Sequence, residues 1–137
     1  MEENTSNKKP IYSFRDLEVY QDSYRCMLEV AQSILPKLPE SEKYDLKDQL
    51  SRSSKAIPRL IAEDFAKKHQ KAGFQKYLDD TMAEINETIV TLSQAKDIYK
   101  VEVELCLKLI ESYDILARRT FKLGEAWDTF INRKRQQ

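Results

Sequence analysis

The side chains that could perform acid–base or metal chemistry stand apart from the partners that such chemistry needs. The one histidine, His69, lies in a lysine-rich stretch with no cysteine, serine or carboxylate at motif spacing, so an exposed loop residue is the stronger interpretation. Four carboxylates at short spacing are candidate metal ligands: Asp79, Asp80, Glu84 and Glu87. The Glu-x-x-His motifs of di-metal bundles are missing. We therefore expect no enzyme, no metal, no cofactor and no small-molecule substrate.

Basic side chains suggest a different chemistry, the neutralisation of phosphates. Residues 43–76 contain nine basic and four acidic residues, whereas residues 79–111 contain three and eight. The candidate nucleic-acid-binding residues are Arg52, Lys55, Arg59, Lys67, Lys68 and Lys71. A positive segment beside a negative one is also typical of two solvated helices that attract each other. Both interpretations stay open, and the second is the more ordinary one.

Composition limits the other classes of partner. The 23 basic and 23 acidic residues give a formal net charge of zero, so no field draws the whole molecule to nucleic acid or to an anionic membrane. No apolar run approaches the roughly 20 residues that span a bilayer, and residues 1–10 lack a signal peptide's hydrophobic stretch. We expect a cytoplasmic protein without a membrane partner. Cys26 and Cys106 have no CxxC or Cys/His spacing and are predicted to be buried free thiols.

The elements that must position these residues are helices. The chain has only 2 glycines and 4 prolines among 137 residues, and its abundant Ala, Leu, Glu, Lys, Gln and Arg favour helix. This length fits one domain. We expect a flexible N-terminal tail over 1–13, a bundle domain over 14–133 and a basic C-terminal tail over 134–137.

Apolar residues recur in steps of three and four, which predicts four amphipathic helices. Their expected ranges are 16–35, about 41 to the polar connection 67–71, 72–99 and 102–133. Pro36 and Pro39 end the first helix. Pro58 lies inside the second, where its cost of about 3 kcal/mol predicts a kink rather than a stop. The predicted fold is an all-α, antiparallel up-down four-helix bundle with a kink in helix two, and Ser53 and Ser54 predict close helix approach.

The last helix carries two apolar lines, which is wider than one core seam requires. The first line comprises Val103, Cys106, Ile110, Tyr113 and Ala117. The second line and a nearby tryptophan form the predicted oligomer interface: Leu105, Leu109, Leu116, Leu123, Trp127 and Phe130. The excess apolar surface favours self-association. A single deeply buried helix is the alternative.

Aromatic residues near the two ends of the chain allow two interpretations. Tyr12, Phe14, Tyr20 and Tyr24 could stack on bases, and Phe121 and the C-terminal aromatics could anchor a partner. Core packing is the more ordinary destination for those at helical spacing.

Several segments, in order and with their spacing, resemble the bacterial four-helix-bundle proteins encoded in 23S ribosomal RNA intervening sequences. The N-terminal landmarks are Phe14 to Tyr20, Leu38-Pro39, Glu42 to Tyr44, Leu46, Gln49 to Ser54 and Ile57-Pro58. The later landmarks are Ile61 to Glu63, Phe74, Tyr77-Leu78 and Glu84 to Glu87. Three positions depart from the family pattern: Arg59 replaces its usual asparagine, and Asp45 and Asp64 replace glycines.

The resemblance implies a homo-oligomer, with a pentameric barrel as its expected form. Similar bundle proteins include the accessory variability determinant of diversity-generating retroelements, which are implied to bind nucleic acid and to work with a reverse transcriptase. We therefore expect a non-enzymatic, oligomeric accessory protein that binds RNA or DNA. Two alternatives stay open: an oligomeric scaffold that binds protein without nucleic-acid contact, and a reverse-transcriptase accessory protein of a retroelement.

Overall fold

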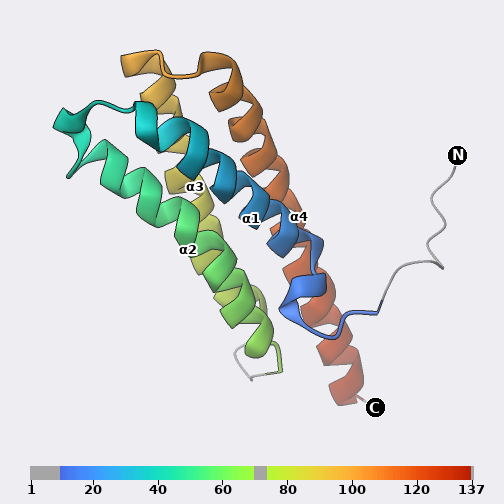
Figure 1. The fold of residues 1–137 in the computed structure, drawn as a ribbon. Helices are drawn as coiled ribbons and strands as arrows, with labels where there is room; N and C mark the ends of the chain where they lie inside the picture. The colour runs from blue at the N-terminus through green and yellow to red at the C-terminus, as the bar shows by residue number, and fades with distance from the viewer. Residues whose placement is uncertain (1–9, 70–73, 137) are drawn as a thin grey trace, which may run out of the picture.

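The computed structural model describes the backbone of residues 10–69 and 74–136, and the side chains of residues 10–69 and 78–127. Its four long helices are α1 (Glu18–Glu29), α2 (Leu46–Ala66), α3 (Phe74–Tyr99) and α4 (Val103–Gln136). They run alternately in opposite directions, and α2, α3 and α4 pack in sequence while α1 lies against α2 and α4 (Figure 1). Within the described ranges there is no strand. The predicted all-α four-helix bundle is confirmed.

The first helix is shorter than predicted and changes its period before it ends. After α1 the chain forms a π-helix, η3 (Val30–Ile34), and a 3₁₀ helix, η4 (Leu35–Lys37). Pro36 has no N–H to continue an α-helical ladder. The Leu35 N–H donates instead to the Val30 carbonyl, five residues back. This wider turn leads the chain out of the helix while Val30 and Ile34 stay buried.

The second helix begins later than predicted and continues through its proline. Residues Glu40–Glu42 form a short 3₁₀ helix, η5, and α2 starts at Leu46. The helix includes Pro58 and reaches Ala66, so the proline does not stop it. The kink at Pro58 stays a prediction.

Hydroxyl groups fill the middle of the contact between α2 and α3. Ser53 and Ser54 are buried, as their small size predicted. The Thr88 hydroxyl of α3 donates to Ser53 Oγ over 2.8 Å, and Ser54 Oγ donates to the Leu50 carbonyl over 2.7 Å. These bonds satisfy polar groups that burial would otherwise penalise. The two helices can therefore approach closely without a larger apolar side chain between them.

A left-handed residue ends α3 and turns the chain into α4. Lys100 has a φ of 54°, and its N–H donates to the Lys96 carbonyl over 3.1 Å, which is the αL form of a helix C-cap. Next to it, the Tyr99 hydroxyl donates to the Glu42 carboxylate over 2.5 Å. This hydrogen bond joins the connection between α1 and α2 to the end of α3.

The last helix extends beyond the predicted C-terminal boundary of the bundle domain. Helix α4 runs to Gln136, so residues 134–136 of the predicted C-terminal tail continue the helix. Residues 1–9 of the predicted N-terminal tail lie outside the described residues. Of the helices in the described parts, none has the length and apolar character needed to cross a membrane.

Candidate nucleic-acid interface

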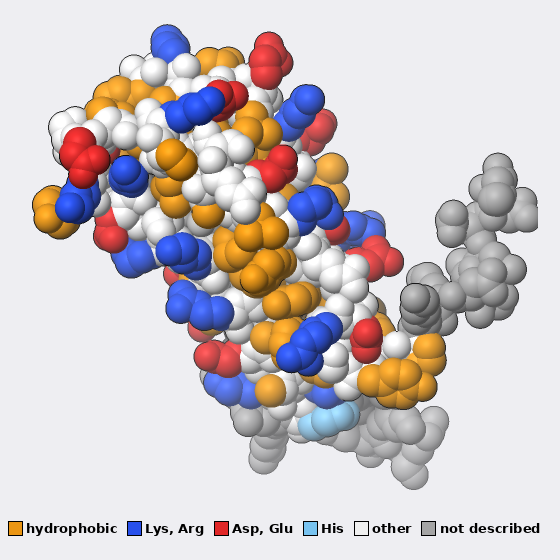
Figure 2. Space-filling view, in the orientation of Figure 1, with side chains coloured by type: hydrophobic (Ala, Val, Ile, Leu, Met, Phe, Trp, Pro, Cys, Tyr) orange, Lys and Arg blue, Asp and Glu red, His pale blue; other side chains and the backbone are white. Residues whose placement is uncertain are grey.

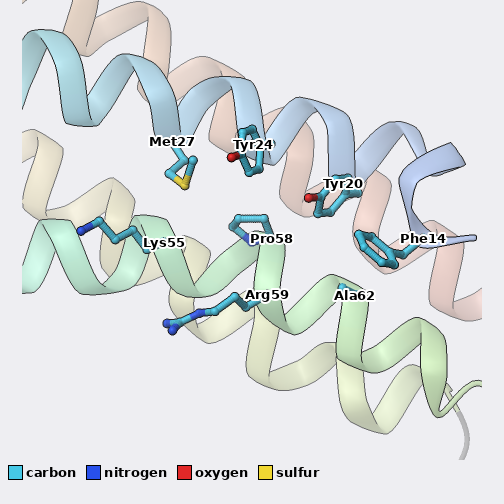
Figure 3. A pocket seen from close by; sticks show the side chains of 8 residues that line it. All are labelled: Phe14, Tyr20, Tyr24, Met27, Lys55, Pro58, Arg59 and Ala62. Carbon is cyan, nitrogen blue, oxygen red and sulfur yellow. The ribbon is translucent and has the colours of Figure 1, made fainter.

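A groove of about 400 Å³ runs between α1 and α2. Its lining residues are Phe14, Tyr20, Tyr24, Met27, Lys55, Pro58, Arg59 and Ala62 (Figure 3). Six of these side chains are apolar or aromatic, and the two charged ones are both cations. Figure 2 shows the hydrophobic side chains as a band along this face, with lysine and arginine at its border. The groove therefore combines ring surfaces with positive charge.

The α1 wall consists of side chains that the core does not use. Val19, Ser23 and Cys26 occupy the buried face of α1. Tyr20 and Tyr24, one helical turn apart, extend from a neighbouring flank toward α2 (Figure 3). This flank of α1 is therefore left to form a wall of the groove.

Arg119 of α4 holds the other side of α1. Its guanidinium donates to Asp22 over 2.9 Å and to Glu18 over 2.6 Å. These pairs are exposed and contribute little to the free energy of unfolding. They lie on the side of α1 that faces α4, while the tyrosine flank remains toward α2.

The chain entering α1 places Phe14 at the end of the groove. Residues Phe14–Asp16 form a 3₁₀ helix, η2, with a capping box. Ser13 Oγ accepts the Arg15 N–H over 3.2 Å, and the Asp16 carboxylate accepts the Ser13 N–H over 3.1 Å. This reciprocal cap satisfies backbone donors at the start of the turn, and it fixes the backbone that carries the Phe14 ring.

Three rings form a row along the α1 wall. The Phe14 and Tyr20 rings meet edge to face with centroids 4.8 Å apart, and the Tyr20 and Tyr24 centroids are 5.9 Å apart. Both distances are within the range of favourable aromatic pairs. Tyr24, at the outer end, is 44% exposed. The row thus presents one ring that is packed on a neighbour and still open to solvent.

Helix α2 supplies small side chains and two cations to the opposite wall. Pro58 and Ala62 are one turn apart, and so are Lys55 and Arg59. Both cations are exposed. Within the described residues, no carboxylate oxygen lies within 4.0 Å of the Lys55 ammonium or the Arg59 guanidinium. Their charge is available to an anionic ligand.

Three other predicted phosphate-binding residues do not line the groove: Arg52, Lys67 and Lys68. Arg52 is exposed and bonded to Asp48 over 3.1 Å. The Lys68 ammonium lies 3.8 Å from the Phe65 ring centroid. Lys67 is half-buried at the end of α2, and the side chain of Lys71 falls outside the described residues. Of the five candidates that the structure describes, two therefore lie together with the aromatic row, Lys55 and Arg59.

A family model, 23S rRNA-intervening sequence protein, matches residues 15–122 of this chain. The chain belongs to the 23S rRNA-intervening sequence protein family. The matched range contains every groove residue except Phe14. A search of curated proteins and a search of solved structures each found no match.

Two of the three departures from the family pattern affect the surface and the core of this 23S rRNA-intervening sequence protein. Arg59, in place of the usual asparagine, adds a guanidinium to the groove. Asp64, in place of glycine, is only 3% exposed. At the third position, Asp45 has a φ of −128°, which lies outside the left-handed region that favours glycine.

Asp64 is a buried carboxylate between α2 and α3. The Thr81 hydroxyl donates to Asp64 Oδ2 over 2.9 Å. Burial raises the pKa of Asp64 to about 7, and the Thr81 hydrogen bond opposes that rise. The carboxyl group faces the helix contact and lies away from the groove lining, so its effect concerns the stability of the bundle.

The described leucines of the second apolar line of α4 do not form a free surface, which corrects part of the predicted oligomer interface. Leu109 and Leu116 are 1% and 2% exposed and belong to the core of their own subunit. Leu105 and Leu123 are partly buried against that core. The rotation of α4 directs these four leucines toward the other helices, so they pack internally.

Trp127 also makes a contact within its own subunit. Its indole N–H donates to the Lys68 carbonyl over 3.0 Å, and its ring centroid is 5.9 Å from that of His69. Trp127 is half-buried and His69 is exposed, as predicted for the histidine. The side chain of Phe130 lies outside the described residues. The tryptophan therefore joins α4 to the end of α2.

Both cysteines lie in the interior of the bundle. Cys26 and Cys106 are buried free cysteines, as predicted. Burial raises the pKa of Cys26 to about 11, with Arg25 opposing the rise, so this thiol is protonated at neutral pH and is a weak nucleophile. Among the residues that the structure describes, no group of three or more His, Cys, Asp or Glu side chains is placed to hold a metal ion.

Proposed function

We propose that this chain is a non-enzymatic, homo-oligomeric protein that binds nucleic acid through the groove between α1 and α2. The observation that carries the proposal is a pair of cations beside an aromatic row: Lys55 and Arg59 have no carboxylate partner among the described residues. Phosphates are neutralised by such cations, and bases stack on such rings. The rRNA intervening sequence in the family's name supports a nucleic-acid context.

An oligomer would raise the affinity for nucleic acid, which the two cations of a single groove leave weak. Two cations give weak binding, but a ring of subunits repeats them and multiplies the contacts along one strand. The family resemblance favours five copies.

The surface available for self-association is the outer face of α4. Val103, Leu107 and Ile115 lie on one i, i+4 row, interrupted by Glu111, and all three are exposed. Exposed apolar side chains at such spacing are typical of protein contacts.

Reversing the groove charges tests nucleic-acid binding. We expect Lys55→Glu/Arg59→Glu to weaken the binding of labelled RNA and DNA at least tenfold at 50 mM salt, because phosphate contacts are lost. We also expect it to reduce the slope of log K against log salt by about 2 for each bound subunit. Fluorescence anisotropy at 50 and 200 mM salt measures both quantities.

The matched control makes the same charge change at the far end of the bundle. Lys43 and Lys100 are exposed there, and Lys43→Glu/Lys100→Glu should bind like the parent protein. If the parent protein binds neither RNA nor DNA at 50 mM salt, the proposal fails and a protein-binding scaffold becomes the better interpretation.

Charge on the outer face of α4 tests self-association. We expect Leu107→Glu/Ile115→Glu to lower the sedimenting mass at micromolar concentration, because two carboxylates would be buried without partners in the contact. Gln94→Glu on the exposed side of α3 is the control and should leave the mass unchanged. A parent protein that sediments as a monomer at high concentration would refute this part of the proposal.

A further inference from the structure

We infer that the groove between α1 and α2 takes the unpaired bases of a single-stranded nucleic acid, with Tyr24 as the outer stacking ring. This inference rests on the proposed function and adds the class of ligand: a single strand rather than a duplex.

The aromatic row is ordered before any ligand arrives. Phe14 is held by the capped turn η2, Tyr20 packs edge to face on Phe14, and Tyr24 follows at 5.9 Å. A preordered ring loses little conformational freedom when a base stacks on it. Tyr24 remains 44% exposed although it belongs to this row, so a ligand can cover surface that the fold leaves open.

The cations are placed for the backbone of the same strand. Lys55 and Arg59 are on α2, across the groove from the tyrosines on α1 (Figure 3). In a single strand, bases and phosphates are offset from each other, so bases can contact one wall while phosphates contact the other. A duplex can reach the cations, but its base faces are already stacked and cannot reach the tyrosines.

The composition of the groove also favours a nucleic acid over an acidic peptide. Three of its eight lining residues are aromatic and lie in one row, and the Pro58 and Ala62 side chains leave room in front of them. Base–aromatic stacking tolerates any sequence because each base has a ring face. A helical peptide would instead need apolar anchors repeated over two turns.

The test compares one exposed tyrosine with another. We expect Tyr24→Leu to weaken binding of a labelled 12-nucleotide single-stranded RNA about 5- to 100-fold, and to leave binding of the same sequence as a blunt duplex unchanged. Tyr24→Phe keeps the ring and should restore binding to within about twofold. Tyr44→Leu is the control, since Tyr44 is 87% exposed and lies outside the groove.

A second readout locates the bound base directly. RNA containing 5-iodouridine, irradiated with the parent protein, should crosslink to the peptide that contains Tyr24, as identified by mass spectrometry. Circular dichroism of each variant establishes that the fold is kept.

The outcomes separate this inference from the proposed function. If Lys55→Glu/Arg59→Glu loses binding while Tyr24→Leu binds the single strand like the parent, the groove cations bind phosphate and the base-stacking inference is wrong. Equal parental affinity for the single strand and the duplex would also overturn it. An acidic amphipathic peptide that displaces the RNA and depends on Tyr24 would assign the groove to a protein ligand.

Discussion

Replacing Asp64 with asparagine is expected to stabilise the bundle, and the gain should grow by about 2–3 kcal/mol between pH 5 and pH 8. Asp64 is 3% exposed and accepts a hydrogen bond from the Thr81 hydroxyl. Asparagine has nearly the same shape and can accept the same bond through its amide oxygen. The substitution therefore removes the ionisable group while keeping the contact between α2 and α3.

The sign follows from the pKa of Asp64 in the folded and unfolded chains. In the folded protein, burial raises this pKa to about 7 from an ordinary value of 3.8; Asp80 and Glu63 add to the rise, and Thr81 and Lys67 oppose it. Between these two values, the folded chain holds one more proton than the unfolded chain. The free energy of unfolding of the parent protein therefore falls as the pH rises through this window, and it levels off above pH 7.

Urea unfolding at pH 5, 6, 7 and 8 measures the difference between the two proteins. The control is Glu63→Gln, which removes the neighbouring carboxylate on the exposed side of α2 and should change the pH profile only slightly. If the curves for Asp64→Asn and the parent remain parallel over this range, the buried carboxylate does not carry the pH dependence.

The helices themselves could be predicted because their signals are local. Steps of three and four between apolar residues identified all four, and Ser53 and Ser54 indicated the close contact of α2 with α3. The conformation at the end of the first helix could not be predicted. Pro36 indicates that the helix ends, but several backbone conformations can end it. The π-helix that the chain adopts depends on keeping both Val30 and Ile34 in the core.

The burial of Asp64 was not predicted, and aspartate is rarely buried in proteins unless its charge is paired. A signal did exist in the spacing, since Ile57, Ile61 and Asp64 follow one another by four and three residues on the buried face of α2. The spacing of residues in the sequence gave no comparable indication of the groove. It arises from how α1 sits between α2 and α4, which depends on contacts between residues far apart in the sequence, such as Arg119 with Glu18.

The interface prediction failed at Leu109 for a related reason. Spacing shows that two apolar lines lie on one broad side of the last helix, but it does not give the rotation of that helix about its axis. The structure turns Leu109 and Leu116 inward and leaves Leu107 exposed, two residues away from Leu109. Leu107 and Leu109 thus offer a matched comparison of core and surface.

Leu109→Ala is expected to lower the free energy of unfolding by about 2–5 kcal/mol, because it removes a side chain that is 1% exposed and leaves a cavity. Leu107→Ala, at a position 49% exposed, should change it by about 0.5 kcal/mol or less in the dilute subunit. Urea unfolding at low protein concentration gives both values. Sedimentation at higher concentration then distinguishes the core role of Leu109 from the surface role of Leu107, since Leu107→Ala should weaken self-association. If Leu109→Ala instead dissociated the oligomer while leaving the subunit as stable as the parent, Leu109 would face a neighbouring subunit and the packing of α4 described above would be wrong.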